Sequence, residues 1–174
     1  NEGASLQGDK GGFLTFISPK GTVTNYAYQQ ENGSWLGSVP QDLFITNNKM
    51  YIVSQNGGND GFLVIANAET LKKEISFQDE LNGKISWPTH VAVLGDDNVY
   101  LRDNTGVYLF HPSNKEVTFI KGTEGARKNT MAVAEGKVFV SKNNSVVVIE
   151  ENKDEISQTI NFDGNVSGVI KSAD

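Results

Sequence analysis

Oxygen-bearing side chains in the segment 161–174, NFDGNVSGVIKSAD, follow the spacing of a calcium-binding loop. Asp163, Asn165, Ser167 and Asp174 would stand at the first, third, fifth and twelfth positions of an EF-hand. An EF-hand loop needs a helix on both sides, whereas the residues just before this segment alternate apolar and polar side chains like a strand. We therefore expect no metal site here.

Two tryptophans, Trp35 and Trp87, each lie in a loop that leads into an apolar strand. An exposed aromatic ring offers a large contact area at low entropic cost, and it suits the face of a flat ring or a sugar. The alternative is that each indole fills a gap between packed sheets, because tryptophan is mostly buried on average.

The candidate ligand-binding residues lie just before an expected inner strand or at the end of the strand that follows it. Loops at such places carry the binding groups while the strands hold them in position. The alternative is that the polar members are ordinary solvated loop ends, because turn residues are polar by default. The candidates are Trp35, Gln41, Gln55, Asn56, Trp87, His90, Arg102, Asp103, Arg127 and Lys142.

Catalytic chemistry finds little support in the sequence. The histidines, His90 and His111, fall in different repeat units, and neither belongs to an HExxH pair. No Gly-x-Ser-x-Gly segment occurs, and the absence of cysteine excludes thiolate nucleophiles, thiolate zinc sites and disulfides. We interpret both histidines as structural, and we expect a protein that is not an enzyme and uses no metal and no cofactor.

The composition is that of one acidic, strand-rich domain. The chain has 174 residues, a formal net charge of −6, 37% hydrophobic residues, 18 glycines and 4 prolines. Many glycines and few prolines are typical of short strands joined by tight turns. A net negative charge repels phosphate backbones, so nucleic acid is not an expected partner.

Self-comparison shows that the chain repeats a unit of paired strands. Each outer pair has an apolar strand, a polar turn and an alternating strand. Inner pairs precede three of the outer pairs and align the aromatic residues Tyr51, Tyr100 and Phe139. Four strands in about 40–50 residues is the period of a β-propeller blade. The outer pairs read GFLTFISPKGTVTNY, GFLVIANAETLKKEISF, GVYLFHPSNKEVTFI and NSVVVIEENKDEISQTI.

The predicted fold class is therefore all-β, a β-propeller of four-stranded antiparallel blades, with about three and a half blades in a single partial propeller over 1–174. Because a propeller closes its ring so that few strand edges stay open, we expect the remaining propeller half or a second chain to complete it. The expected parts are an outer hairpin at 12–28, blades at 41–78, 88–120 and 128–160, and an inner strand of the next blade at 165–174.

The inner pairs resemble known propeller repeats. KMYIVS, NVYLRD and KVFVSK resemble the YVTN-type repeats of surface-layer-like seven-bladed propellers, with Arg102-Asp103 departing most. Asn1-Glu2-Gly3, Asn32-Gly33 and Leu36-Gly37 are similar to the N-terminal part of a family of surface lipoprotein propellers from gut bacteria with an outer membrane. The resemblance covers essentially the whole chain and about half of a typical member.

The resemblance implies an exported outer-membrane surface lipoprotein, with its signal and anchor outside this chain, that forms a seven-bladed ring. The characterised branch of that family captures cobalamin beside an outer-membrane transporter. Its ligand residues form no motif that matches this sequence, so none is carried over.

The expected function is non-enzymatic ligand binding at the cell surface, assisting an outer-membrane transporter in nutrient capture, with a cobalamin-like or glycan ligand. A protein-interaction scaffold is one alternative, because many propellers serve only as rigid surfaces for partners. A hydrolase or lyase propeller is another, with part of its site outside this chain and contributions from His90, Asp42 and Asp103.

Overall fold

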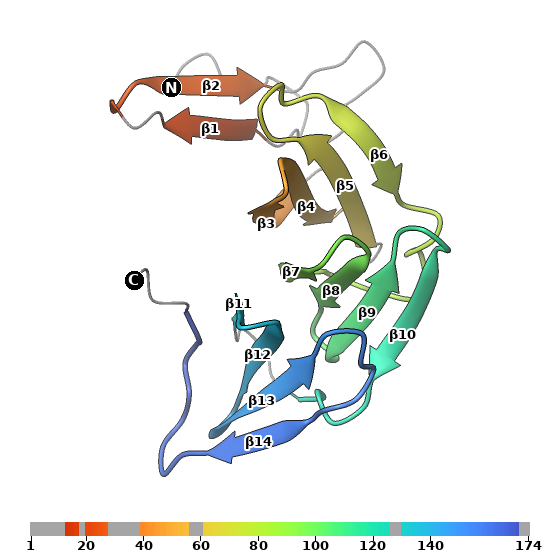
Figure 1. Ribbon diagram of the computed structural model, residues 1–174, viewed down its shortest axis with the longest axis vertical. Helices are drawn as coiled ribbons and strands as arrows, with labels where there is room; N and C mark the ends of the chain where they lie inside the picture. The colour runs from red at the N-terminus through yellow and green to blue at the C-terminus, as the bar shows by residue number, and fades with distance from the viewer. Residues whose placement is uncertain (1–12, 18–19, 28–38, 56–60, 126–129, 171–174) are drawn as a thin grey trace.

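The computed structural model describes residues 13–17, 20–27, 39–55, 61–125 and 130–170 (Figure 1). Every regular element in these ranges is a β-strand. The described residues thus contain no helix able to cross a membrane. The prediction of an all-β fold is confirmed.

The strands are short, as expected for a chain rich in turns. They are β1 (Phe13–Ile17), β2 (Val23–Ala27), β3 (Val39–Thr46), β4 (Lys49–Gln55), β5 (Gly61–Asn67), β6 (Lys73–Phe77), β7 (His90–Leu94), β8 (Asn98–Arg102), β9 (Val107–His111), β10 (Glu116–Ile120), β11 (Met131–Ala134), β12 (Lys137–Lys142), β13 (Ser145–Glu150) and β14 (Gln158–Asn161).

The strands form three antiparallel sheets of four, β3–β6, β7–β10 and β11–β14, and a two-stranded sheet, β1–β2. Within each sheet of four, every strand pairs with its neighbour in the sequence. Figure 1 shows these sheets fanning out along an arc, with β3, β7 and β11 on the concave side and β6, β10 and β14 outside. This is the blade arrangement of a propeller, so the predicted blade architecture is confirmed.

Tight turns set the register of the inner strand pairs. Asn47 and Asn48 have φ angles of 47° and 58°, and Glu135 and Gly136 have φ angles of 50° and 68°. Left-handed values at both central residues define the hairpin turn whose twist matches that of the flanking strands. Asparagine and glycine tolerate this region best, so the polar turns of the sequence translate directly into two-residue hairpins.

The middle sheet, β7–β10, packs against a neighbouring sheet through each of its faces. Alternate residues of β7 divide between two cores: Val93 packs in the first core with Val53, and Ala92 packs in the second with Val140. All residues of β8 are buried. A strand covered on both faces needs no polar side, which explains the continuous apolar runs in the sequence.

The expected inner strand at 165–174 lies partly outside the described residues, and its described part, 165–170, forms no strand. This segment nevertheless lies against the third sheet. The Val169 N–H donates to Thr130 Oγ1 over 2.6 Å, and that hydroxyl donates to the Val169 carbonyl over 3.0 Å. A Cβ atom added at Gly168 would lie 2.8 Å from Thr130 Oγ1, so glycine permits the approach.

The packing between the first two sheets generates a stability prediction. Phe110 is fully buried, and its ring meets that of Phe77 edge to face with centroids 4.9 Å apart. Replacing Phe110 by alanine removes a buried ring and leaves a cavity, so we expect a loss of about 3–5 kcal/mol in the free energy of unfolding. Urea denaturation measures this loss. The exposed Ile75 gives a control, since Ile75→Ala should cost less than about 1 kcal/mol.

Candidate ligand-binding site

Asp42, His90 and Thr130 occupy equivalent positions in the three concave segments: Asp42 lies within β3, His90 begins β7, and Thr130 directly precedes β11. Asp42 pairs with Val53, His90 pairs with Arg102, and the Thr130 carbonyl accepts a 3.3 Å hydrogen bond from the Ser141 N–H. Each side chain therefore belongs to the face of its sheet that meets the next sheet along the arc. These positions form the seams between neighbouring inner strands.

Two of the seams carry the same side-chain hydrogen bond. The Val91 N–H at the start of β7 donates to Asp42 Oδ2 over 3.0 Å. The Val169 N–H donates in the same way to Thr130 Oγ1. In each case an oxygen of one inner strand accepts the N–H of the neighbouring inner segment. We call this bond the inner-strand latch.

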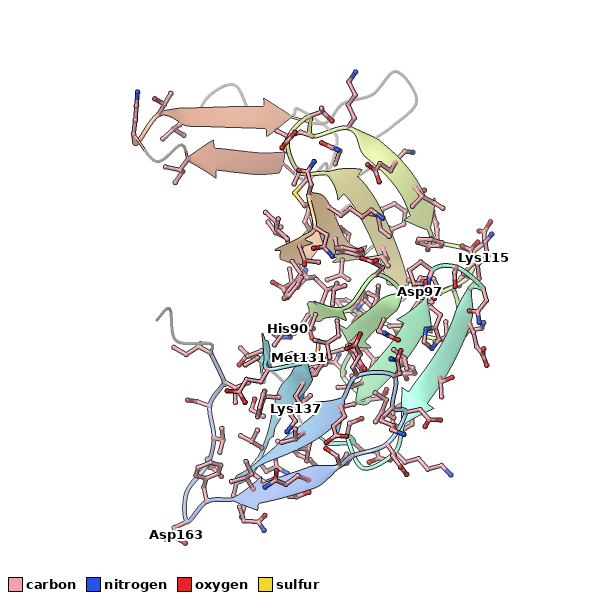
Figure 2. The ribbon with its side chains drawn as sticks, viewed as in Figure 1. His90, Asp97, Lys115, Met131, Lys137 and Asp163 are labelled. Atoms are coloured by element: carbon pink, nitrogen blue, oxygen red, sulfur yellow. The ribbon has the colours of Figure 1, made fainter. Side chains whose placement is uncertain are left out.

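His90 occupies the latch position in the seam between β7 and β11, and Figure 2 shows it beside Met131 at the start of β11. Its Nδ1 lies 3.0 Å from Thr89 Oγ1. Burial lowers the pKa of His90, and the nearby Arg102 charge acts in the same direction, while Asp42 opposes both. The neutral imidazole is therefore favoured in the folded protein.

We call the loop ends around the first residues of the concave strands the rim. Arg102 and Asp103, at the end of β8, are buried below this rim and take part in hydrogen bonds within the protein. Arg102 Nη1 donates to the Ser141 carbonyl over 3.2 Å, and burial lowers the pKa of Arg102 to about 10. Asp103 Oδ1 accepts bonds from the backbone N–H groups of Thr105 and Gly106, and Oδ2 accepts the Ser86 N–H over 3.2 Å. Both side chains thus fix loops instead of facing solvent.

The remaining candidates are spread along the rim. Gln41 is exposed on β3, and Lys142 Nζ donates to the Gly122 carbonyl over 2.7 Å. Gln55 ends β4, but its side chain lies outside the described part of the structure. Trp35, Asn56 and Arg127 also lie outside the described residues.

Among the candidates that the structure describes, Trp87 is the aromatic one, and it is partly exposed. Its side chain is 43% exposed, and its backbone has a φ of 58°. A bulky residue with positive φ is uncommon and occurs where the surrounding chain determines the conformation. Bonds on both sides hold this loop: the Ser86 N–H donates to Asp103 and the Thr89 N–H donates to the Arg102 carbonyl over 2.7 Å. Pro88 is buried between them.

Sequence reasoning missed Thr130 as a member of the rim. The available signal was its alignment with Asp42 and His90 at the start of the inner strands. No group of three or more His, Asp or Glu side chains suited to a metal ion occurs in the ranges that the structure describes. Asp163, from the calcium-like segment, is exposed (Figure 2).

A hollow of about 340 Å³ opens beside the first inner strand. It is lined by Pro40, Gln41, Asp42 and Leu43 of β3 and by Ile52 of β4. Two sequence candidates line this hollow: Gln41 from the ligand-binding set and Asp42 from the hydrolase alternative.

Comparisons with known proteins give a family and a fold. Over residues 1–174 the sequence matches the family described as Domain of unknown function (DUF5074). Among solved structures, Kuenenia stuttgartiensis hydrazine synthase is similar with a TM-score of 0.56 and 14% identity, over 74% of this chain and 38% of that chain. The computationally designed Ika8 protein is similar with a TM-score of 0.56 and 14% identity, over 93% of this chain and 50% of that one.

The chain therefore spans half or less of either solved structure, and at this identity the likeness concerns the fold alone. A comparison with curated proteins finds no match.

From the inner-strand latch we predict that removing its acceptor oxygen lowers the free energy of unfolding. Asp42→Ala leaves the Val91 N–H without its carboxylate partner, so we expect a loss of about 1–3 kcal/mol in the free energy of unfolding. Asp42→Asn keeps an oxygen acceptor and should recover most of this loss. Chemical denaturation of both variants measures the difference, and equal stability of the two would contradict the latch.

From the lowered pKa of His90 we predict that the stability of the fold depends on pH. Because its folded pKa lies below the unfolded value, the unfolded chain binds more protons as the pH falls. The contribution of His90 to the free energy of unfolding should therefore be complete above about pH 6.5, and it should decline as the pH falls from there to the folded pKa. Urea midpoints at several pH values measure the decline. His90→Gln should flatten it, with His111→Gln as the matched control, and an unchanged slope in His90→Gln would refute the assignment.

Proposed function

Since the chain belongs to the DUF5074 family, whose description assigns no activity, we propose a function from the geometry of the rim: non-enzymatic ligand binding. Trp87 carries the proposal. The ligand presents a flat or apolar-faced ring, as a cobalamin-like macrocycle or a glycan does.

The clamped loop of Trp87 supports binding by stacking. A loop whose backbone is already fixed loses little conformational entropy when a ligand covers it, so more of the contact energy appears as affinity. Two backbone bonds and a buried proline hold the loop that carries the indole before any ligand arrives. Ring stacking also requires no charge match, which suits an otherwise neutral ligand face.

The state of the charged candidates favours binding over catalysis. A general acid or base must reach the proton that it transfers. Asp103 is buried and both its oxygens accept hydrogen bonds, and Arg102 is buried beneath the rim. Neither is presented to a substrate, so the proposed site recognises and holds its ligand.

The cellular setting extends the proposal. The resemblance of the inner pairs to YVTN-type repeats favours a ring of seven blades, exported and anchored as a lipoprotein at the outer-membrane surface. There the protein would pass its ligand to a membrane transporter. A purely scaffolding propeller is the competing function, and it predicts protein partners without any small-molecule binding.

Titration of the full chain with a panel of cobamides and oligosaccharides tests the proposal by tryptophan fluorescence and calorimetry. Trp87→Ala should weaken binding of the active compound at least about tenfold, because stacking of one ring on an aromatic side chain contributes about 1–3 kcal/mol. Phe162→Ala is the matched control, since Phe162 is similarly exposed but lies beyond β14. Equal affinity in Trp87→Ala would refute the site, and an absence of binding to the whole panel would favour the scaffold.

A further inference from the structure

Two loops at the top of the first seam are tied to one buried carboxylate. Asp103 Oδ2 accepts the Ser86 N–H over 3.2 Å, and Ser86 directly precedes Trp87. Asp103 Oδ1 accepts the Thr105 N–H over 2.7 Å and the Thr105 hydroxyl over 2.6 Å. The loop that carries Trp87 and the loop between β8 and β9 thus bond to the two oxygens of the same side chain. Trp87 and Thr105 therefore belong to one small region of the surface.

A second hydroxyl joins this region from β9. Tyr108 Oη lies 2.7 Å from Thr105 Oγ1. Tyr108 is half-buried, and its ring meets that of Phe119 edge to face with centroids 5.1 Å apart. Thr105 is exposed. Because ring packing holds the phenol and Asp103 holds the threonine, the two oxygens form a preformed pair at the surface.

The protons of this hydroxyl pair point inward. A carboxylate only accepts hydrogen bonds, so the single hydroxyl proton of Thr105 is directed to Asp103. Thr105 Oγ1 then accepts the proton of Tyr108. Burial raises the pKa of Tyr108, and the Asp103 charge acts in the same direction, so the phenol keeps that proton at neutral pH. The outward side of the pair consequently presents oxygen lone pairs, which a ligand meets with hydrogen-bond donors.

These features distinguish between the ring-shaped ligands that suit Trp87. An anionic group brings acceptors and a charge of the same sign as Asp103, so it is disfavoured. A saccharide ring carries adjacent hydroxyls, about one hydrogen-bond length apart, that can donate to both oxygens, and it has a C–H face that suits an indole. A corrin-type macrocycle carries its amide donors on separate flexible side chains instead.

We propose that the ligand of this site is a neutral saccharide. This inference rests on the proposed binding function and narrows its two ligand classes to one. The sugar ring lies on the Trp87 indole, and two adjacent hydroxyls donate to Tyr108 Oη and Thr105 Oγ1. Asp103 is a positioning residue, because it holds both loops and directs the Thr105 proton away from the ligand.

Saturation-transfer difference NMR of the full chain with methyl glucoside, methyl galactoside, methyl mannoside and cyanocobalamin tests the proposal. At least one glycoside should bind. Tyr108→Phe removes one acceptor oxygen and keeps the ring, so it should weaken glycoside binding about fivefold. One monodeoxy analogue of that glycoside should bind the parent chain about fivefold more weakly than the glycoside itself. Tyr108→Phe should bind this analogue and the glycoside equally, because the bond in question is absent from both complexes.

Tyr100→Phe is the matched control. It also removes one phenol oxygen, but that oxygen donates to the Glu150 carbonyl within the second seam, so glycoside affinity should stay unchanged. Circular dichroism checks that both variants remain folded, and the deoxy series on the parent chain needs no variant.

The outcomes separate this inference from the proposed function. Equal glycoside affinity in Tyr108→Phe and the parent chain, or equal binding of the glycoside and all its deoxy analogues by the parent, would overturn the hydroxyl contacts while leaving binding at Trp87 in place. Binding of cyanocobalamin alone would overturn the saccharide and keep the proposed function. No binding of any compound in the series would overturn both.

Discussion

Burial of both faces of the middle sheet, β7–β10, is the constraint on which this structure depends. A sheet of four strands with apolar side chains on both sides is stable only when neighbours cover it, and here the neighbours are other sheets of the same design. Val93 and Ala92, adjacent in β7, enter different cores for this reason. The inner-strand latch then fixes how far each sheet can slide along the next, since Asp42 must meet one particular N–H, that of Val91.

This constraint also decides which polar residues remain available for binding. Residues near the rim that enter a seam become part of the packing, and their ionisation changes accordingly. Burial lowers the pKa of Arg102 to about 10 and, with the help of Glu151, raises the pKa of Tyr100 to about 12. The Tyr100 hydroxyl donates to the Glu150 carbonyl across the seam over 3.3 Å. Trp87 stays partly exposed because it lies in the loop between β6 and β7, outside the two cores that flank β7–β10.

The fold could be predicted from the sequence because its signals are local and repeated. The turn at Asn47-Asn48 and the aligned aromatic residues Tyr51, Tyr100 and Phe139 recur at blade spacing, and each acts within one hairpin. The site could be predicted only as a rim of loops. Whether Asp103 faces solvent depends on Ser86, which is distant in the sequence. The positive φ of Trp87 likewise has no sequence signal, because no glycine or asparagine marks it.

Each seam in the described arc joins sheets that are consecutive in the chain, which has a consequence for synthesis. Val91 finds Asp42 already made, and Val169 finds Thr130 already made, so no seam between described sheets waits for a distant segment. In repeat architectures with nearest-neighbour contacts, structure spreads from one unit to the next. The arc can therefore assemble in the order in which the ribosome releases it, each new sheet covering the apolar face that its predecessor leaves open.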